Sequence, residues 1–469
     1  MSGAVIPRTR AHRADERSRD VRSRGLTWRA FDLGFGGALA LAGALLAWSG
    51  VESTIAWRDP QLGGPAPARQ AWRWHRALTP AYERWARERS ADARAARLPI
   101  DDIAGTEWPL FGSVYYLRAT ENLDRAWQRA PDGPRPREYA RGAIDACADL
   151  LADPVQAHWV MRHWGERDYL DREDVFYRMM LVDGLATQWR LLGASPHAEL
   201  LRAQVDAFAN ELSASADGLL ADYPSQTFPA DVAAAWHAIR RADEVLGTDH
   251  RAAADAARRG FVDAMAPDGE LPPYAWFGDP PRPTPVRGSA NAWLLHHAPF
   301  LWPDLARTWS RANDRRYWVP SRWLGGYREY DARASDMDSG DVDSGPSVAG
   351  IGTAASAFGI GAARSVGDVE RARTLALQAI AVSVPLPNGR LLLPRLASDA
   401  TDAPLLGEAA LLYNLTQPPA PGFDAATAAV DATPRAFWLV LALQVLGGLF
   451  LLRRGALRIA RATRRRAPV

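Results

Sequence analysis

Residues 217–239 read DGLLADYPSQTFPADVAAAWHAI, and this stretch sets the pattern from which the fold is predicted. A loop of acidic and aromatic residues ends at Pro229, and a run of small and apolar residues follows it. Proline is favoured at the first position of a helix, and a helix that is apolar on all sides is buried. The stretch therefore predicts an inner helix over residues 229–246, entered directly from a polar loop.

Two other parts of the chain repeat this order. Residues 268–271 (DGEL) lead through an aromatic loop to small residues at 289–292, and the acidic loop 336–346 leads to small residues at 350–355. A more polar helix is expected after each, at intervals of about 50 to 60 residues, which is the scale of helical hairpin repeats. We therefore predict an all-α domain built as an (α/α)6-type toroid of helical hairpins, with an irregular all-helical domain as the alternative.

Other helices are predicted from hydrophobic periodicity and from the placing of proline, glycine and aspartate. Thr79 and Pro80 are interpreted as the N-cap and first turn of a helix, and Asp171 with Asp174 as a capping pair before Val175. Further helices are expected at residues 139–151, 196–213, 250–265, 288–302, 303–318, 346–363, 368–384 and 404–415.

Two uncharged runs bracket this domain. Leu33–Val51 and Ala436–Leu452 are each long enough to cross the hydrocarbon layer of a bilayer as a helix. The alternatives are a cleaved signal peptide for the first run and a buried core helix for the second. We predict cytoplasmic arginine-rich tails over residues 1–30 and 453–469, transmembrane helices over 31–51 and 436–452, and an extracytoplasmic domain over 52–435.

The charge distribution gives the predicted orientation. The net charge of +2 consists of +5 before residue 30, +7 after residue 452 and −10 between them. Positive charge flanking a span marks its cytoplasmic side, so both termini are expected in the cytoplasm. The basic residues are all arginine, which is typical of a GC-rich bacterial genome, so the expected location is a bacterial inner membrane. The lipid bilayer is the predicted partner.

Composition excludes several classes of protein. A single cysteine excludes a disulfide framework and cysteine-rich metal sites. The central domain has no basic patch with interleaved aromatic residues, so nucleic-acid binding is not expected. No zinc-protease, serine-hydrolase, phosphate-loop or dinucleotide motif is present, and no cofactor is predicted. The oligomeric state is left open.

The pattern of helix pairs, together with residues 223–231 (YPSQTFPAD) and 340–346 (GDVDSGP), resembles the six-hairpin (α/α)6 toroid superfamily. That superfamily includes glycoside hydrolases, polysaccharide lyases and sugar epimerases. Residues 107–112 (EWPLFG) and 247–250 (GTDH) are most similar to linalool dehydratase/isomerase-like domains. Those enzymes use cysteines near the corresponding helix entry, where this chain has aspartates, so their terpene-alcohol chemistry does not transfer directly.

The resemblance implies that the loops entering the inner helices meet at one mouth, where carboxylates serve as acids and bases. The candidate catalytic residues are Asp231, Asp343, Glu107 and Asp222. The candidate substrate-binding residues, which offer aromatic faces and an amide, are Trp108, Tyr115, Tyr223, Gln226, Tyr274 and Trp276. For each, an ordinary structural role in a helix cap or core is the alternative.

Asp343 belongs to a crowded loop with Asp336, Asp338 and Asp341. The spacing does not match a calcium-binding EF-hand loop, so no metal ligand is assigned there.

Three functions follow in order of preference. The first is an anchored extracytoplasmic enzyme, a hydrolase or lyase, that acts by carboxylate acid/base catalysis on a cell-envelope glycan or glycolipid. The second is a hydro-lyase or isomerase similar to linalool dehydratase/isomerase, acting on a prenyl or terpene alcohol. The third is a non-catalytic scaffold or binding module of the envelope. The fold alone does not choose among them.

Overall fold

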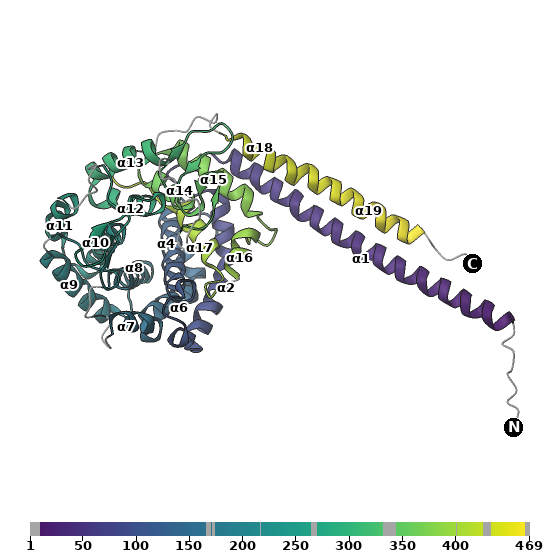
Figure 1. Ribbon diagram of the computed structural model, residues 1–469, viewed down its shortest axis with the longest axis horizontal. Coiled ribbons are helices and arrows are strands. Elements are labelled where there is room, and N and C mark those ends of the chain that lie inside the picture. The colour runs from purple at the N-terminus through teal and green to yellow at the C-terminus, as the bar shows by residue number, and fades with distance from the viewer. Residues whose placement is uncertain are drawn as a thin grey trace, which may run out of the picture. The chain divides into compact units, whose positions relative to one another are not determined.

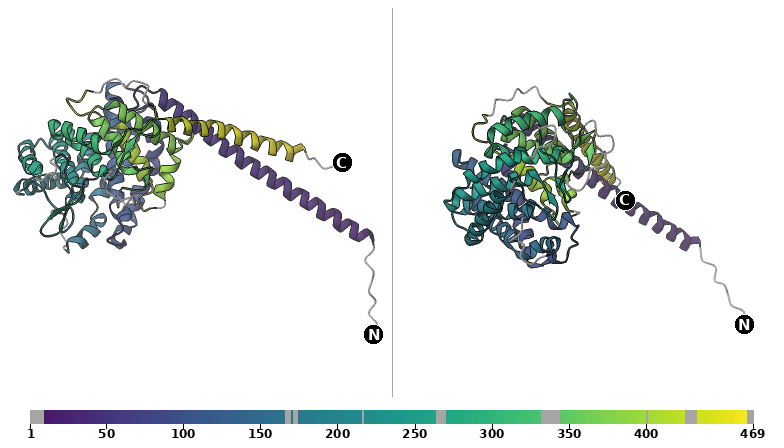
Figure 2. Two further views of the ribbon diagram at one scale, coloured as in Figure 1. Left: turned by 45° about the horizontal axis from the view of Figure 1, so that its top comes forward. Right: turned by 60° about the vertical axis from the view of Figure 1, so that its left-hand side comes forward.

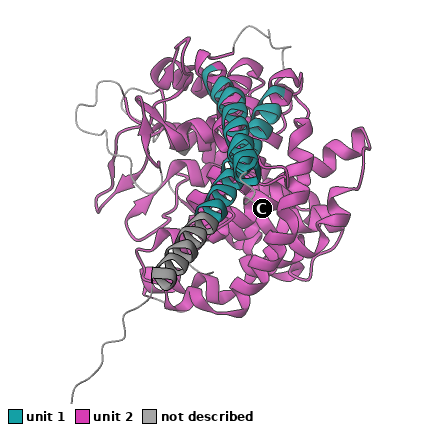
Figure 3. Ribbon diagram, turned by 90° about the vertical axis from the view of Figure 1, so that its right-hand side faces the viewer, with its two compact units in different colours: residues 1–54, 439–469 teal, residues 55–438 magenta. Residues whose placement is uncertain are grey.

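The computed structural model describes residues 10–165, 170, 174–215, 217–263, 270–331, 344–399, 401–424 and 433–464; for residues 10–27, 260, 261 and 263 only the backbone is described. Helices hold 70% of the residues and strands 4%, which confirms the all-α prediction. The chain divides into two compact units, residues 1–54 with 439–469 and residues 55–438, which Figure 3 colours separately.

The first unit contains most of the two apolar helices, whose residues 55–58 and 435–438 belong to the second unit. They are α1 (Arg10–Arg58) and the continuous series α18 (Arg435–Ala442), a π-helical turn (Leu443–Gly447) and α19 (Gly448–Arg464). The segments Trp28–Arg58 and Arg435–Arg464 are each long enough, and apolar enough over an 18-residue stretch, to cross a membrane. Both predicted runs therefore lie in helices of sufficient length and apolarity to span a bilayer.

Glycines allow these two helices to pack backbone against backbone. A Cβ atom added at Gly43 would lie 2.6 Å from the carbonyl oxygen of Gly448, and one added at Gly455 would lie 2.6 Å from that of Gly36. Contacts this close require small residues, as is common between helices in membranes. Ser53 adds a polar contact by donating a hydrogen bond to Gln444 Oε1 at 3.0 Å.

In the second unit, six helices follow one another in a closed series of contacts. They are α4 (Trp108–Arg129), α8 (Val175–Leu192), α10 (Pro229–Leu246), α12 (Gly288–Leu301), α14 (Thr353–Ser365) and α17 (Leu406–Thr416). Each packs against the next in this order, and α17 packs back against α4, as Figure 1 shows.

A second set of helices lies outside this ring. The set comprises α2 (Arg69–Ala91), α6 (Arg141–Ala152), α9 (Ala198–Ala214), α11 (Arg251–Asp263), α13 (Pro303–Tyr317), α15 (Val369–Ser383) and α16 (Leu392–Asp399). The contacts include α6 and α9 on α8, α13 on α12, α15 on α14, and α2 and α16 on α17. Figure 2 shows the same helices from two further directions.

Short elements complete the unit. The remaining helical turns are η1 (Arg94–Arg97), α3 (Ile103–Thr106), α5 (Pro136–Tyr139), η2 (Pro154–Ala157) and α7 (His158–Trp164). The strands form three small antiparallel sheets. The first contains β1 (Gln226–Thr227), β2 (Trp276–Phe277) and β3 (Arg282–Pro283). The second contains β4 (Trp318–Val319) and β5 (Gly326–Tyr327), and the third contains β6 (Ser347–Val348) and β7 (Ile351–Gly352).

The inner helices are buried on most of their sides, although they carry charged residues. In α10, Pro229 occupies the first turn, small residues are buried around the helix, and Gly247 ends it with φ +71°. A helix buried to this extent depends on tertiary packing for its stability. The predicted bounds 229–246 are those observed.

Two predicted helix starts are wrong. The helix expected from residue 346 begins at Thr353, because residues 347–352 form the β6–β7 hairpin. The helix expected to begin at Thr79 and Pro80 instead begins at Arg69, and α2 runs through Pro80. Thr79 is inside this helix, where its hydroxyl donates to the carbonyl of His75 at 2.8 Å. Packing of the buried face of α2 outweighs the hydrogen bond that proline removes.

Candidate functional site

The N-terminal ends of α4, α8 and α10 meet at one end of the ring, where a side chain of α12 reaches them. The amide of Val175, the first residue of α8, donates to the carbonyl of Ala221 in the loop that enters α10, at 3.2 Å. Tyr223 from the same loop donates to Glu107, which directly precedes α4. Trp293 of α12 reaches Asp231 in the first turn of α10. Residues that are distant in sequence therefore form one carboxylate cluster, which consists of Glu107, Asp174, Asp222 and Asp231.

Asp222 is the most buried member that the sequence predicted. Its side chain is inaccessible to solvent, and its Oδ2 accepts the amide of Phe228 at 2.8 Å. Its Oδ1 is also buried and has no hydrogen-bond partner among the described residues. Burial raises the pKa of this carboxyl well above its usual range, the nearby charge of Asp231 raises it further, and the Phe228 amide opposes both. The protonated form is thus favoured at a pH where an exposed aspartate is ionised.

Asp174 is a second buried acid, for which the sequence predicted only a capping role. It precedes α8 with φ +25°, a backbone conformation that is rare for residues other than glycine. Both side-chain oxygens are buried. Burial raises the pKa of Asp174 well above its usual range; the positive charge of Arg178 and a hydrogen bond from the Tyr177 backbone oppose this shift, and Glu107 adds to it. Asp171, its predicted capping partner, lies outside the described residues.

The other two acids accept hydrogen bonds from aromatic side chains. The Tyr223 hydroxyl donates to Glu107 Oε1, and Trp293 Nε1 donates to Asp231 Oδ1 at 2.8 Å. Both carboxylates are half-buried. The cluster thereby contains two acids that are fully buried and two that are half-buried and accept a hydrogen bond from an aromatic side chain.

Aromatic rings line the inner helices next to the cluster. Tyr115 stacks on Tyr413 with ring centroids 5.2 Å apart and lies edge-on to Trp293 at 6.0 Å. Phe111 contacts Phe176 at 4.9 Å and Tyr115 at 5.5 Å. Burial raises the pKa of the Tyr115 hydroxyl, so it remains a neutral phenol. The side chains next to the acids are thus mostly apolar aromatic rings.

Three further predicted binding residues lie at the small sheet beside the α10 entry. In this sheet Thr227 pairs with Trp276 and Gln226 with Phe277. Tyr274 precedes β2 and contacts Phe228 with ring centroids 5.2 Å apart. The guanidinium of Arg287 lies 4.4 Å from the Tyr274 ring centroid.

The remaining predicted residues are placed in part. Trp108 is half-buried and begins α4 directly after Glu107. Asp343, the predicted partner of Asp231, lies outside the described residues, as do Asp336, Asp338 and Asp341. Within the described part of the chain, no group of three or more histidine, cysteine, aspartate or glutamate residues is arranged to hold a metal ion.

Acids at two other inner helices have plainly structural roles. Glu329 accepts from Arg287 at 2.8 Å and from the hydroxyl of Ser289 at 2.6 Å, at the start of α12. Glu408, in the first turn of α17, pairs with Arg390 and accepts the amide of Leu391 at 2.8 Å. Such acids are neutralised and fixed where they lie.

A further charged group lies inside the ring, and its carboxylates are bound by arginine. Asp183 contacts Arg118 at 3.0 Å and Arg241 at 2.6 Å, and Glu121 pairs with Arg241 and with Arg190 at 2.6 Å. Burial outweighs Arg118 and raises the pKa of Asp183 to about 6. These helices are therefore joined by buried ion pairs.

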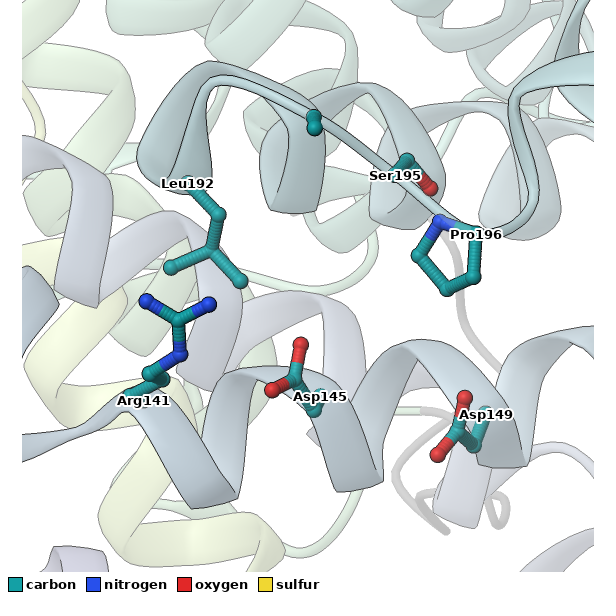
Figure 4. A pocket seen from close by; sticks show the side chains of 7 residues that line it. Arg141, Asp145, Asp149, Leu192, Ser195 and Pro196 are labelled. Carbon is teal, nitrogen blue, oxygen red and sulfur yellow. The ribbon is translucent and has the colours of Figure 1, made fainter.

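An open hollow shown in Figure 4 lies elsewhere. It is lined by Arg141, Asp145 and Asp149 of α6 and by the connection after α8 at residues 192–196. Asp145 accepts from Gln188 at 3.0 Å and Asp149 from His197 at 2.9 Å. Because this hollow adjoins the C-terminal end of α8, it is separate from the cluster at the N-terminal end.

No model of a known protein family matches the chain, and no curated protein matches it.

Proposed function

We propose that the second unit is a six-hairpin (α/α)6 toroid whose mouth is the carboxylate cluster. The closed order of contacts from α4 through α17 supports this architecture, as does the outer set of helices. The meeting of three inner-helix N-termini at the cluster, together with Trp293 of α12, supports the position of the mouth.

We propose that the protein is a hydrolase or lyase that uses carboxylate acid/base catalysis. The observation that carries this proposal is Asp222, a buried acid with one oxygen lacking a described hydrogen-bond partner, whose pKa is raised by burial and by the nearby charge of Asp231. A pair of carboxyl groups held in unlike environments separates into a proton donor and a proton acceptor. Asp222 is the proposed acid, with Asp174 in support, and Asp231 is the proposed base.

The proposed substrate is a cell-envelope glycan or glycolipid. Aromatic faces suit sugar rings, and Tyr223, Tyr274 and Trp276 supply them around the entry of α10. The two apolar helices would anchor the enzyme in the bacterial inner membrane, with both arginine-rich termini in the cytoplasm and the ring on the far side. A substrate attached to or near that membrane would then lie within reach.

One observation favours the second candidate, a hydro-lyase or isomerase of a prenyl or terpene alcohol. The rings of Phe111, Tyr115, Trp293 and Tyr413 form an apolar layer beside the acids. A protonated carboxyl next to such a layer could protonate an alcohol and release water.

The test uses the full-length protein in lipid nanodiscs and two panels of substrates. The first panel contains envelope glycans and lipid-linked oligosaccharides, and the second contains prenyl alcohols. The products of both are analysed by mass spectrometry. We expect cleaved glycan products from the wild type and from Asp145→Asn, and at least a hundredfold less from Asp222→Asn and Asp231→Asn. Asp145 is the control because it is half-buried and hydrogen-bonded but lies at the separate hollow.

The other outcomes overturn this assignment. Dehydrated or isomerised prenyl products that depend on Asp222 would replace the glycan-cleaving function with the second candidate. Equal glycan cleavage by all four proteins would remove Asp222 and Asp231 from catalysis. No conversion of either panel would favour a non-catalytic scaffold.

A further inference from the structure

The second unit has a loop fixed to the first residues of the second apolar segment. The amide of Arg435 donates to the carbonyl of Arg322 at 2.9 Å, and the amide of Ala436 donates to that of Trp323 at 2.9 Å. Arg435 is the first residue of the segment that can cross a membrane. Residues 320–325 therefore lie at the level at which this segment begins.

The loop presents an exposed tryptophan on a well-held backbone. Trp323 is 58% exposed, and among the tryptophans of residues 55–438 only Trp438 is also exposed. The hydroxyl of Ser321 accepts the Trp323 amide at 3.0 Å. Gln378 of α15 holds Gly325 by hydrogen bonds to its amide at 3.2 Å and its carbonyl at 2.7 Å. The exposure of Trp323 is thus a property of a fixed loop.

Basic and aromatic side chains lie around Trp323 and the start of the apolar segment. The guanidinium of Arg435 lies 5.7 Å from its ring centroid, and the side chain of Arg322 is exposed. Trp57 and Trp438 pack together with ring centroids 5.1 Å apart, and Trp57 Nε1 donates to Thr433 at 3.2 Å, two residues before Arg435. Tryptophan concentrates at the headgroup level of bilayers, and arginine there contacts lipid phosphates.

We propose that residues 320–325 form a membrane-surface contact in which Trp323 enters the headgroup layer of the bilayer while Arg322 and Arg435 face lipid phosphates. The bilayer is the expected contact of this loop because two backbone hydrogen bonds join the loop to the start of the segment that can cross a membrane. The contact gives the second unit a point of attachment besides its two helical connections and limits its tilt. The proposal rests on the apolar segments spanning a membrane and is independent of the proposed enzymatic activity.

Spin labelling of the full-length protein in vesicles of phosphatidylethanolamine and phosphatidylglycerol tests this contact. A label at Trp323→Cys is compared with one at Val262→Cys, an exposed apolar position on α11. The only native cysteine, Cys147, is buried, and burial raises the pKa of its thiol, so it should not react in the folded protein. We expect relaxation by oxygen relative to a water-soluble nickel complex to be at least threefold greater at position 323 than at position 262.

Equal ratios at the two positions would place Trp323 in water and overturn the proposal. A second copy of the protein could also cover the loop. The label would then be shielded from both reagents, and labels on two molecules would lie a short distance apart. This result would also overturn the proposal. A second measurement retains the native cysteine. Quenching by lipids brominated near the headgroup should be smaller in Trp323→Phe than in the wild type, and unchanged quenching would contradict the contact.

Discussion

Replacing Arg241 should reveal how strongly the buried charge network holds the ring together. Arg241 lies on α10, is 6% exposed, and contacts Asp183 at 2.6 Å, Thr187 Oγ1 at 2.9 Å and Glu121. Arg241→Met keeps an apolar stem but leaves two buried carboxylates with one arginine fewer. Breaking a buried ion pair costs about 3–5 kcal/mol.

Arg118 and Arg190 remain beside these acids, so the lower end of that range applies. A loss of about 3 kcal/mol corresponds to a shift of roughly a hundredfold in the folding equilibrium. The pKa of Asp183 is already raised to about 6 by burial. Loss of Arg241 raises the pKa of Asp183 further. Ionising Asp183 then costs more free energy in the folded chain than in the unfolded chain. The destabilisation should therefore be larger at pH 8 than at pH 5.

The assay is denaturant unfolding of the full-length protein in nanodiscs, followed by circular dichroism at both pH values. The control is Arg315→Met, because Arg315 pairs with Glu270 at 2.9 Å while their side chains are 61% and 49% exposed. An exposed pair contributes less than about 1 kcal/mol. If Arg241→Met were no more destabilising than the control, the view that this network stabilises the ring would be wrong.

Three other predictions concern the cluster and the apolar helices. Because the raised pKa of Asp222 makes its ionisation unfavourable in the folded state, the wild type should lose stability as pH rises from about 4 through that pKa. Asn cannot ionise, so the melting temperature of Asp222→Asn relative to the wild type should increase over this interval; a constant difference would contradict the burial argument. Trp293→Phe removes a hydrogen bond to Asp231 and should cost about 1.5–3 kcal/mol in denaturant unfolding, and a neutral result would argue against that bond. Gly43→Val should lower the melting temperature in nanodiscs, because a Cβ there meets Gly448, whereas Gly37→Val, with open space around it, should not; equal effects would refute the close packing.

Local patterns predicted the helices whose ends are marked by strong signals. Pro229 and Gly247 bound α10 as expected, and the uncharged runs at both ends of the chain lie in long helices. The same signals misled at Pro80, because tertiary packing maintains α2 through a residue that usually ends a helix. Local propensity does not report how well a face is buried.

Part of the site could also be predicted, since Glu107, Asp222 and Asp231 each lie at the entry to an inner helix. Asp174 was missed as an acid because its sequence context suits a capping residue equally well. Only the structure shows that its oxygens are buried and that its backbone has a positive φ. The sequence signal that could have identified Asp174 as a site acid was its position directly before an inner helix, as at Glu107. The partners of Asp183 lie 65 and 58 residues away, beyond the reach of spacing rules.

The protonation state of Asp222 tests the central claim most directly. Infrared difference spectra of the full-length wild type and Asp222→Asn at pH 7 would show whether this carboxyl carries a proton, without any assumption about the substrate. The proposed acid role predicts that the wild type has a carbonyl stretching band of a buried protonated carboxylic acid and that Asp222→Asn lacks it. A difference spectrum with only carboxylate bands would show that Asp222 is ionised and would contradict its assignment as the proton donor.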